Sequence, residues 1–339
     1  MMAVDKINVA GDDRVQYRSA DVNGIRYGYL YAEPPSKQYK ATIFLIHGFP
    51  DLSIGWRYQI PMLLDKGLRV VAPDCLGYGQ TDAPESLERY SHKRHADDIK
   101  ALAAQLGESK IILGGHDWGA SLAYRVALWH PDLVSHVFTV CVPYASPTPR
   151  FASIAEMVAR SAPHFAYQLQ FISGEVERAF TSREQIKAFL NTLYAGRTPK
   201  KEVAFDVEKG VLMDRVFDVQ RSRLLSEEEI DYYVSQYARN GLHGPLNWYR
   251  TRQINHTDEL ALLNRTITAP VLFIQALRDT ALPPHLGRNM ASKLPSLTVE
   301  TVDSTHWALW EKPAEVNAFV GRWLDEVVFR DLETFAARI

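Results

Sequence analysis

One carboxylate stands out in the sequence because of the turn in which it lies. Residues 114–120 read G-G-H-D-W-G-A and directly follow the apolar run 110–113. Asp117 is near the middle of this segment, and the glycines on both sides permit a tight turn between a strand and a helix. A carboxyl group with an ordinary pKa of about 4 is ionised at neutral pH. It can therefore attack a saturated carbon that bears a leaving group without help from a base. The simpler alternative is that Asp117 only caps the helix that follows.

A second carboxylate and a histidine lie where they could serve this nucleophile. Asp279 follows the strand-like run 271–275, and His306 follows the strand-like run 298–302. Both are therefore expected in loops at the ends of late strands. The order nucleophile, acid, histidine is the chain order of a catalytic triad on one class of α/β sheet. We expect His306 to activate water and Asp279 to orient its imidazole.

The elements that would position these residues alternate between strands and helices. Strands are predicted at 15–22, 25–32, 41–46, 69–72, 110–113, 135–141, 271–275 and 298–302. The first two flank Asn23-Gly24, a pair typical of a type I′ hairpin turn. Helices are predicted over 99–106, between 113 and 135, and over 316–327. Apolar strands in alternation with helices predict an α/β fold with a mostly parallel sheet flanked by helices.

This alternation breaks off in the middle of the chain. Three prolines predict a linker there: Pro143, Pro147 and Pro149. From 151 to 255 the periodicity is mostly helical with no convincing strand, and Ser226 with Glu229 forms a capping-box pattern that opens a helix. We therefore expect one α/β core with an inserted helical cap. The predicted segments are 1–145 for the first part of the core, 146–255 for the cap and 256–339 for the second part of the core.

The composition argues against several classes of protein. The chain has 339 residues and a formal net charge of −2, without the basic surplus typical of nucleic-acid-binding proteins. No apolar stretch approaches the roughly 18 residues needed to span a bilayer. Residues 1–20 lack the apolar core of a secretory signal. The two cysteines, Cys75 and Cys141, do not suggest a disulfide framework. We expect a cytoplasmic protein without membrane insertion, and its oligomeric state stays open.

Motifs along the chain resemble those of the soluble, single-domain epoxide hydrolases of the α/β-hydrolase superfamily. The resemblance runs from about residue 20 to residue 325. In chain order the motifs are H-G-F-P at 47–50, W-R-Y-Q-I-P at 56–61, G-Y-G at 77–79, G-H-D-W-G at 115–119, Y-Q-L at 167–169, G-P-L-N-W-Y-R at 244–250 and H-W at 306–307. The H-G-F-P and H-D-W-G pair is shared with related dehalogenases, whereas the two tyrosine motifs are more specific.

The resemblance implies that the chain converts a small-molecule epoxide to a vicinal diol without a cofactor or a metal. Asp117 would form a covalent alkyl ester, and water activated by His306 and Asp279 would hydrolyse it. The backbone N–H groups of Phe49 and Trp118 would form the oxyanion hole.

The resemblance also assigns residues of the cap and the pocket. Tyr167 and Tyr249 would donate hydrogen bonds to the epoxide oxygen as the ring opens. Gln168 and Trp307, which stand next to catalytic positions in these motifs, are expected to line the substrate pocket.

Several questions stay open at this level. Asp51 and His116 would position the hydrolytic water, but Asp51 stands where relatives commonly carry Glu, and a structural role is the alternative. A haloalkane or haloacetate dehalogenase uses the same Asp-His-Asp triad, although Phe49 offers no side-chain N–H to a halide. A binding protein that keeps the fold without catalysis is a third class. The sequence does not identify the epoxide, the ring carbon attacked, the preferred enantiomer or the physiological role, such as detoxification.

Overall fold

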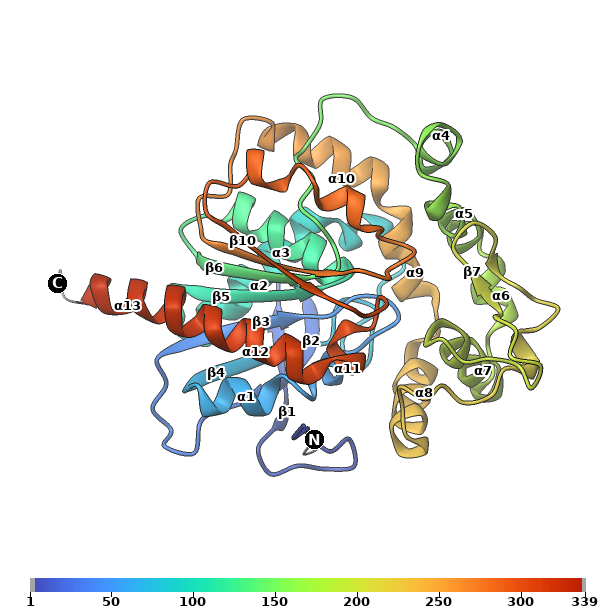
Figure 1. The fold of residues 1–339 in the computed structure, drawn as a ribbon, viewed down its shortest axis with the longest axis horizontal. Helices are drawn as coiled ribbons and strands as arrows, with labels where there is room; N and C mark the ends of the chain where they lie inside the picture. Colours follow the sequence, from blue (N-terminus) through green and yellow to red (C-terminus); the bar gives the residue numbers. More distant parts are fainter. Residues whose placement is uncertain (1–3, 337–339) are drawn as a thin grey trace.

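The computed structural model describes residues 4–336, and its centre is an eight-stranded sheet (Figure 1). The strand order is β1-β2-β4-β3-β5-β6-β9-β10. The strands are β1 (Gln16–Val22), β2 (Ile25–Ala32), β3 (Ala41–Ile46), β4 (Leu68–Pro73), β5 (Ile111–His116), β6 (Val134–Val140), β9 (Val271–Ala276) and β10 (Leu297–Val302). β2 pairs antiparallel with β1 and β4, and every other pairing in the sheet is parallel. The predicted α/β fold with a mostly parallel sheet is confirmed.

Two groups of helices flank this sheet. In one group α2 (His92–Gln105) packs against α3 (Trp118–Trp129) and α10 (Arg252–Glu259). In the other, α12 (Pro313–Trp323) packs against α1 (Ile60–Asp65) and α11 (Ala308–Glu311). Short 3₁₀ helices are η1 (Ser53–Trp56), η2 (Leu87–Tyr90), η3 (Pro163–Phe165), η4 (Val216–Asp218), η5 (Leu260–Leu262), η6 (Pro284–Gly287) and η7 (Met290–Ser292). Within residues 4–336, none of the helices has both the length and the apolar character needed to cross a membrane.

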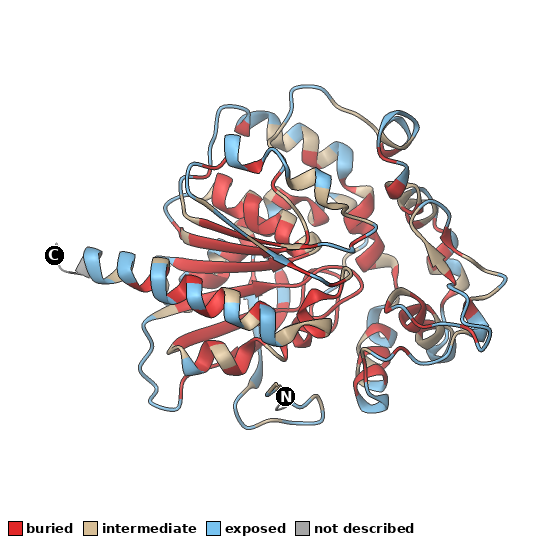
Figure 2. Ribbon diagram, in the orientation of Figure 1, coloured by how far each residue is buried: buried red, intermediate tan, exposed pale blue. Residues whose placement is uncertain are grey.

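The interior of the sheet is the core of the molecule (Figure 2). Every residue of β4 and β5 is buried, whereas at the edges of the sheet five of the seven residues of β1 and three of the six residues of β10 are exposed. Burial on both faces explains why the central strands read as continuous apolar runs rather than as an alternation. The predicted hairpin turn is also present, with positive φ angles of 50° at Asn23 and 79° at Gly24.

The boundaries of two predicted helices differ from those in the structure. α2 begins at His92 rather than 99, because the Ser91 side chain caps it by accepting a hydrogen bond from the Arg94 N–H at 3.3 Å. At the other end of the chain, the predicted helix 316–327 starts earlier and runs further. A π-helical turn, η8 (Leu324–Val328), leads from α12 into α13 (Phe329–Ala336).

The segment between β6 and β9 is mostly helical and lies beside the sheet (Figure 1). Its helices before α10 are α4 (Ile154–Arg160), α5 (Tyr167–Ile172), α6 (Glu175–Ala179), α7 (Arg183–Leu193), α8 (Glu227–Asn240) and α9 (His243–Arg250). The capping box that opens α8 is confirmed. The expectation of no strand here is wrong, since β7 (Phe205–Asp206) and β8 (Gly210–Val211) form a small hairpin. Strands of two residues are too short to show an alternating pattern. The cap limits of 146–255 stay a prediction.

A buried ion pair joins cap helix α8 to the core. Arg57 is fully buried, and its Nε donates to Oε1 of Glu229 at 2.9 Å. The same carboxylate accepts hydrogen bonds from Lys6 Nζ and from the Ser226 N–H, both at 2.7 Å. The Arg57 guanidinium also lies 4.5 Å from the centre of the Trp310 ring. Glu229 thus caps the start of α8 and also supplies the counter-charge for the buried Arg57.

Replacing Glu229 by Gln should destabilise the protein by about 3–5 kcal/mol, because Arg57 would stay buried without its counter-charge. Glu227→Gln is the matched control, since Glu227 is in the same helical turn but pairs with Lys187 and Arg221 in solvent. An exposed pair contributes only about 0–1 kcal/mol. Urea unfolding followed by tryptophan fluorescence measures both free energies. Equal losses in the two variants would contradict this role of Glu229.

Candidate active site

Asp117 lies at the junction of β5 and α3 in a strained backbone conformation. Its φ and ψ are 52° and −126°, in a region that non-glycine residues rarely adopt. Its side chain makes no capping hydrogen bond to α3. The alternative in which Asp117 merely caps the helix is therefore wrong.

The glycines around Asp117 are required by the close packing of this turn. A Cβ on Gly115 would lie 2.5 Å from the carbonyl oxygen of Gly119. A Cβ on Gly119 would lie 2.0 Å from the carbonyl oxygen of Ile46 at the end of β3. Neither contact is sterically possible without moving the backbone. Glycine at 115 therefore lets the turn pack against the start of α3, and glycine at 119 lets it pack against the end of β3.

The loop after β3 supplies a hydrogen-bond donor to the carboxylate. The Phe49 N–H donates to Asp117 Oδ1 at 2.7 Å. Trp118 is the first residue of α3, where backbone N–H groups have no acceptor within the helix. The two N–H groups expected to form an oxyanion hole therefore belong to elements that meet at Asp117.

The structure brings the three residues of the expected triad together. Asp279 follows β9 and His306 follows β10, two neighbouring parallel strands. His306 Nδ1 lies 2.6 Å from Asp279 Oδ2, and His306 Nε2 lies 3.5 Å from Asp117 Oδ2. The Ala281 and Leu282 N–H groups donate to Asp279 Oδ1 at 2.9 and 3.0 Å and hold this carboxylate in place.

Burial and neighbouring charges shift the pKa of His306 in opposite directions, and the same holds for Asp279. Burial by itself lowers the pKa of His306, but the carboxylates of Asp279 and Asp117 outweigh it and raise that pKa to about 10. Burial by itself raises the pKa of Asp279, but His306 and the two backbone donors bring it below its ordinary value. His306 is therefore protonated while both carboxylates are charged.

Two tyrosines of the cap face the same cavity as Asp117, which has a volume of about 730 Å³. Tyr167 begins α5 and Tyr249 lies in α9, and their ring centres are 6.2 Å apart. The Tyr249 ring contacts the rings of Trp118 and Phe49, with centres 5.1 and 5.4 Å away. Burial raises the pKa of both tyrosine hydroxyls well above the ordinary value. Both therefore remain hydrogen-bond donors at neutral pH.

The predicted pocket residues also lie on this cavity. Gln168 lines it and donates from Nε2 to the Tyr167 hydroxyl oxygen at 3.4 Å. Trp307 lines it as well, and its indole N–H donates to the Leu193 carbonyl oxygen at 3.0 Å. The remaining wall includes apolar side chains: Phe171, Leu193, Val203, Phe205, Leu282 and Leu286.

Asp51 and His116, the expected water-positioning pair, have other partners. Asp51 Oδ1 accepts hydrogen bonds from the Tyr233 hydroxyl at 2.6 Å and from the Leu52 N–H at 2.7 Å. His116 Nε2 lies 2.8 Å from the His306 carbonyl oxygen. Burial raises the pKa of Asp51 to about 7 and lowers that of His116 to about 4. Within residues 4–336, no hydrogen bond joins the two side chains.

Three cap tyrosines that the sequence did not single out hold the loop after β3. The Tyr194 hydroxyl donates to the Pro50 carbonyl oxygen, and the Tyr237 hydroxyl donates to the Asp51 carbonyl oxygen at 3.2 Å. Tyr233 contributes the hydrogen bond to the Asp51 carboxylate. All three rings are buried. No local pattern separates them from the other tyrosines among the chain's 16.

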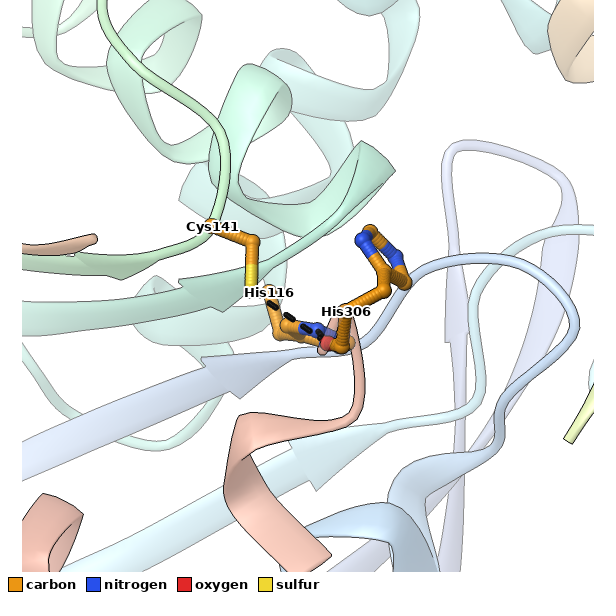
Figure 3. A group of neighbouring side chains, drawn as sticks. All are labelled: His116, Cys141 and His306. Carbon is orange, nitrogen blue, oxygen red and sulfur yellow. Dashed lines mark hydrogen bonds between the residues drawn. The ribbon is translucent and has the colours of Figure 1, made fainter. Parts of the chain in front are cut away.

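A cluster of potential metal ligands lies next to the triad (Figure 3). One ligand atom from each of His116, Cys141 and His306 can be chosen so that all lie within 4.8 Å of one another. The Cys141 thiol, however, donates to the His306 carbonyl oxygen at 3.3 Å, and the His306 ring points away from the sulfur. Burial raises the pKa of this thiol, which disfavours the thiolate that a metal needs. The cluster therefore fits packing better than metal binding.

Comparison with known proteins gives consistent matches over most of the chain. The alpha/beta hydrolase fold family matches residues 41–313. The epoxide hydrolase srdG of Neurospora crassa is 41% identical over 332 residues, covering 93% of this chain and 97% of that protein. The bifunctional epoxide hydrolase 2 of Rattus norvegicus is 33% identical, and the match covers 89% of this chain but 56% of the rat protein.

Solved structures agree with these relatives. The crystal structure of an epoxide hydrolase from Vigna radiata has a TM-score of 0.80 and 26% sequence identity, covering 93% of this chain and 99% of that chain. The resemblance seen in the sequence motifs is thus confirmed by whole-chain similarity. The chain belongs to the epoxide hydrolases of the alpha/beta hydrolase fold family.

Proposed function

We propose that the chain adds water to an epoxide and releases a vicinal diol, with Asp117 as the nucleophile. The observation that carries this proposal is that Asp117, Tyr167 and Tyr249 line one cavity. Opening an epoxide requires a nucleophile for the ring carbon and an acid for the ring oxygen, and this cavity offers both. The relatives that are named epoxide hydrolases support the same reaction.

In the first step, a carboxylate oxygen of Asp117 bonds to a ring carbon while the bond from that carbon to the ring oxygen breaks. The oxygen takes a proton from Tyr167 or Tyr249 as its negative charge develops. Because burial raises the pKa of both hydroxyls, they hold their protons until the ring opens. The product of this step is a hydroxyalkyl ester of Asp117.

In the second step, water attacks the carboxyl carbon of that ester. Esterification removes the charge of Asp117, whose Oδ2 lies 3.5 Å from His306 Nε2 in the free protein. The pKa of His306 then falls, so His306 gives up its proton, which restores the tyrosine hydroxyl, and the neutral imidazole can accept a proton from water. The N–H groups of Phe49 and Trp118 stabilise the oxyanion. Its collapse breaks the ester bond, the second proton of the water passes to the leaving oxygen, and the diol and the Asp117 carboxylate are released.

A haloalkane dehalogenase would use the same triad but a different leaving group. A departing halide needs no proton, so the two buried tyrosine hydroxyls would have no part in that reaction. Phe49 also lacks a side-chain N–H that could hold the halide. The cavity therefore favours an oxygen leaving group that stays attached to the product.

A direct assay separates the two reactions. The purified protein should convert styrene oxide to its diol and should release no halide from a chloroalkane of similar size. Diol can be measured by chromatography and halide by ion-selective electrode. Halide release without diol formation would overturn the proposed function.

The same assay tests the tyrosines. Replacing both Tyr167 and Tyr249 by Phe should slow ring opening by about 10²- to 10⁴-fold, the contribution of general acid catalysis. Tyr144→Phe, which removes another tyrosine hydroxyl from the cavity wall, is the matched control and should leave the rate near that of the parent. Equal rates in the double variant and the parent would exclude the tyrosines as the acid.

Asp117 forms the ester in the proposed reaction, and His306, oriented by Asp279, activates water to hydrolyse it. Replacing Asp279 by Asn should therefore trap the ester. Asp117 can still be alkylated, but His306 loses the carboxylate that orients it, so hydrolysis should slow by roughly 10⁴-fold, as in related triads. Intact-protein mass spectrometry after mixing with styrene oxide should show the added mass of one substrate. Asp303→Asn, three residues before His306 and exposed, is the control and should not accumulate the adduct. Loss of turnover in Asp279→Asn without an adduct would contradict the two-step scheme.

A further inference from the structure

A second polar cluster lies on the wall of the catalytic cavity, and the proposed reaction does not use it. Its members are His92 at the start of α2, Arg125 in α3 and Glu259 at the end of α10. These three helices pack together on the core, and all three side chains line the cavity. The cluster is separate from the triad, which comes from the loops after β5, β9 and β10.

The ring of His92 is buried beside the ion pair of Arg125 and Glu259. It is only 7% exposed, and neither ring nitrogen has a hydrogen-bond partner among residues 4–336. Its ring sits between aromatic neighbours, with centres 6.0 Å from Trp118 and 6.4 Å from Trp248. A buried polar group without a partner costs free energy, so a hydrogen bond from a group in the cavity to this ring would stabilise the complex.

The carboxylate of Glu259 orients the His92 ring. Arg125 Nε lies 2.8 Å from Glu259 Oε1, and His92 Nδ1 lies 3.5 Å from the same oxygen. Burial by itself raises the pKa of Glu259, but His92 and Arg125 bring it down to about 2, so the group is ionised. Because Nδ1 faces this anion it keeps its proton, and Nε2 is the ring nitrogen left to bond to a group in the cavity.

We infer that His92 forms a specificity subsite that hydrogen-bonds to a hydroxyl group of the epoxide substrate. This inference rests on the proposed function and adds the substrate class: an epoxide that also carries an alcohol. Trp118 directly follows the nucleophile and contacts His92, so a substrate attacked at Asp117 can extend toward this cluster. The charges of Arg125 and Glu259 are already paired with each other, so the cluster is expected to prefer a neutral hydroxyl over a carboxylate.

Matched substrates test the subsite. Terminal epoxides of several chain lengths would be compared in three forms, ending in a methyl, a hydroxymethyl or a carboxylate group. We expect the parent protein to show a higher kcat/KM for the hydroxyl form at one or more chain lengths. In His92→Phe, which keeps an aromatic ring against Trp118, the hydroxyl-to-methyl ratio of kcat/KM should fall by about tenfold, the value of one hydrogen bond.

His95→Phe is the matched control. His95 is buried one turn further along α2 and contacts Trp248, with ring centres 4.3 Å apart, but among the described residues it is not part of the cavity wall. The hydroxyl-to-methyl ratio of kcat/KM in His95→Phe should equal that of the parent protein. Both substrates are measured on one preparation, so any loss of folded protein cancels from the ratio.

Each outcome distinguishes the subsite from the proposed function. If the parent protein hydrolyses none of the epoxides, the proposed function itself is wrong. A parent that hydrolyses them without a hydroxyl preference, or with a preference for the carboxylate, overturns the subsite alone. An unchanged ratio in His92→Phe, or an equal fall in His95→Phe, also overturns it.

Discussion

The backbone conformation of Asp117 is the constraint on which the rest of the site depends. A non-glycine residue at φ 52° costs roughly 1–3 kcal/mol, so the surrounding structure must hold it there. Gly119 lets the turn approach β3, and β3 is the direct neighbour of β5 in the sheet. The same closeness places the Phe49 N–H 2.7 Å from the carboxylate. One strained turn therefore presents Asp117, the proposed nucleophile, and aligns a backbone donor with its carboxylate.

The cap is tied to this turn through the loop after β3. Hydrogen bonds from Tyr194, Tyr233 and Tyr237 fix Pro50 and Asp51, which directly follow Phe49. The buried Arg57–Glu229 pair fastens α8 to the core at a second point. The geometry of the backbone donor thus depends on cap docking as well as on the core. The cap also contributes Tyr167 and Tyr249, the proposed acids, to the wall of the cavity that contains Asp117.

The sequence could predict features with local causes. The Asn23-Gly24 turn, the capping box at Ser226 and the apolar central strands follow from backbone preferences and burial, and all are present. The meeting of Asp117, Asp279 and His306 also follows, because parallel strands end at one edge of the sheet. The pairing of Asp51 with Tyr233 and of His92 with Glu259 could not be predicted, since it depends on how α8 and α10 pack on the core, which no strand order fixes. The hairpin of β7 and β8 was missed because strands of two residues are too short to show an alternating pattern.

The central claim is that the substrate becomes covalently bound to Asp117 before water enters the product. A single turnover in isotopically labelled water, with protein in excess over epoxide, tests it most directly. We expect the heavy oxygen in the carboxylate of Asp117, measured by mass spectrometry of the peptide that contains it, and none in the first diol. Heavy oxygen in the diol of the first turnover, with an unlabelled Asp117, would contradict the account.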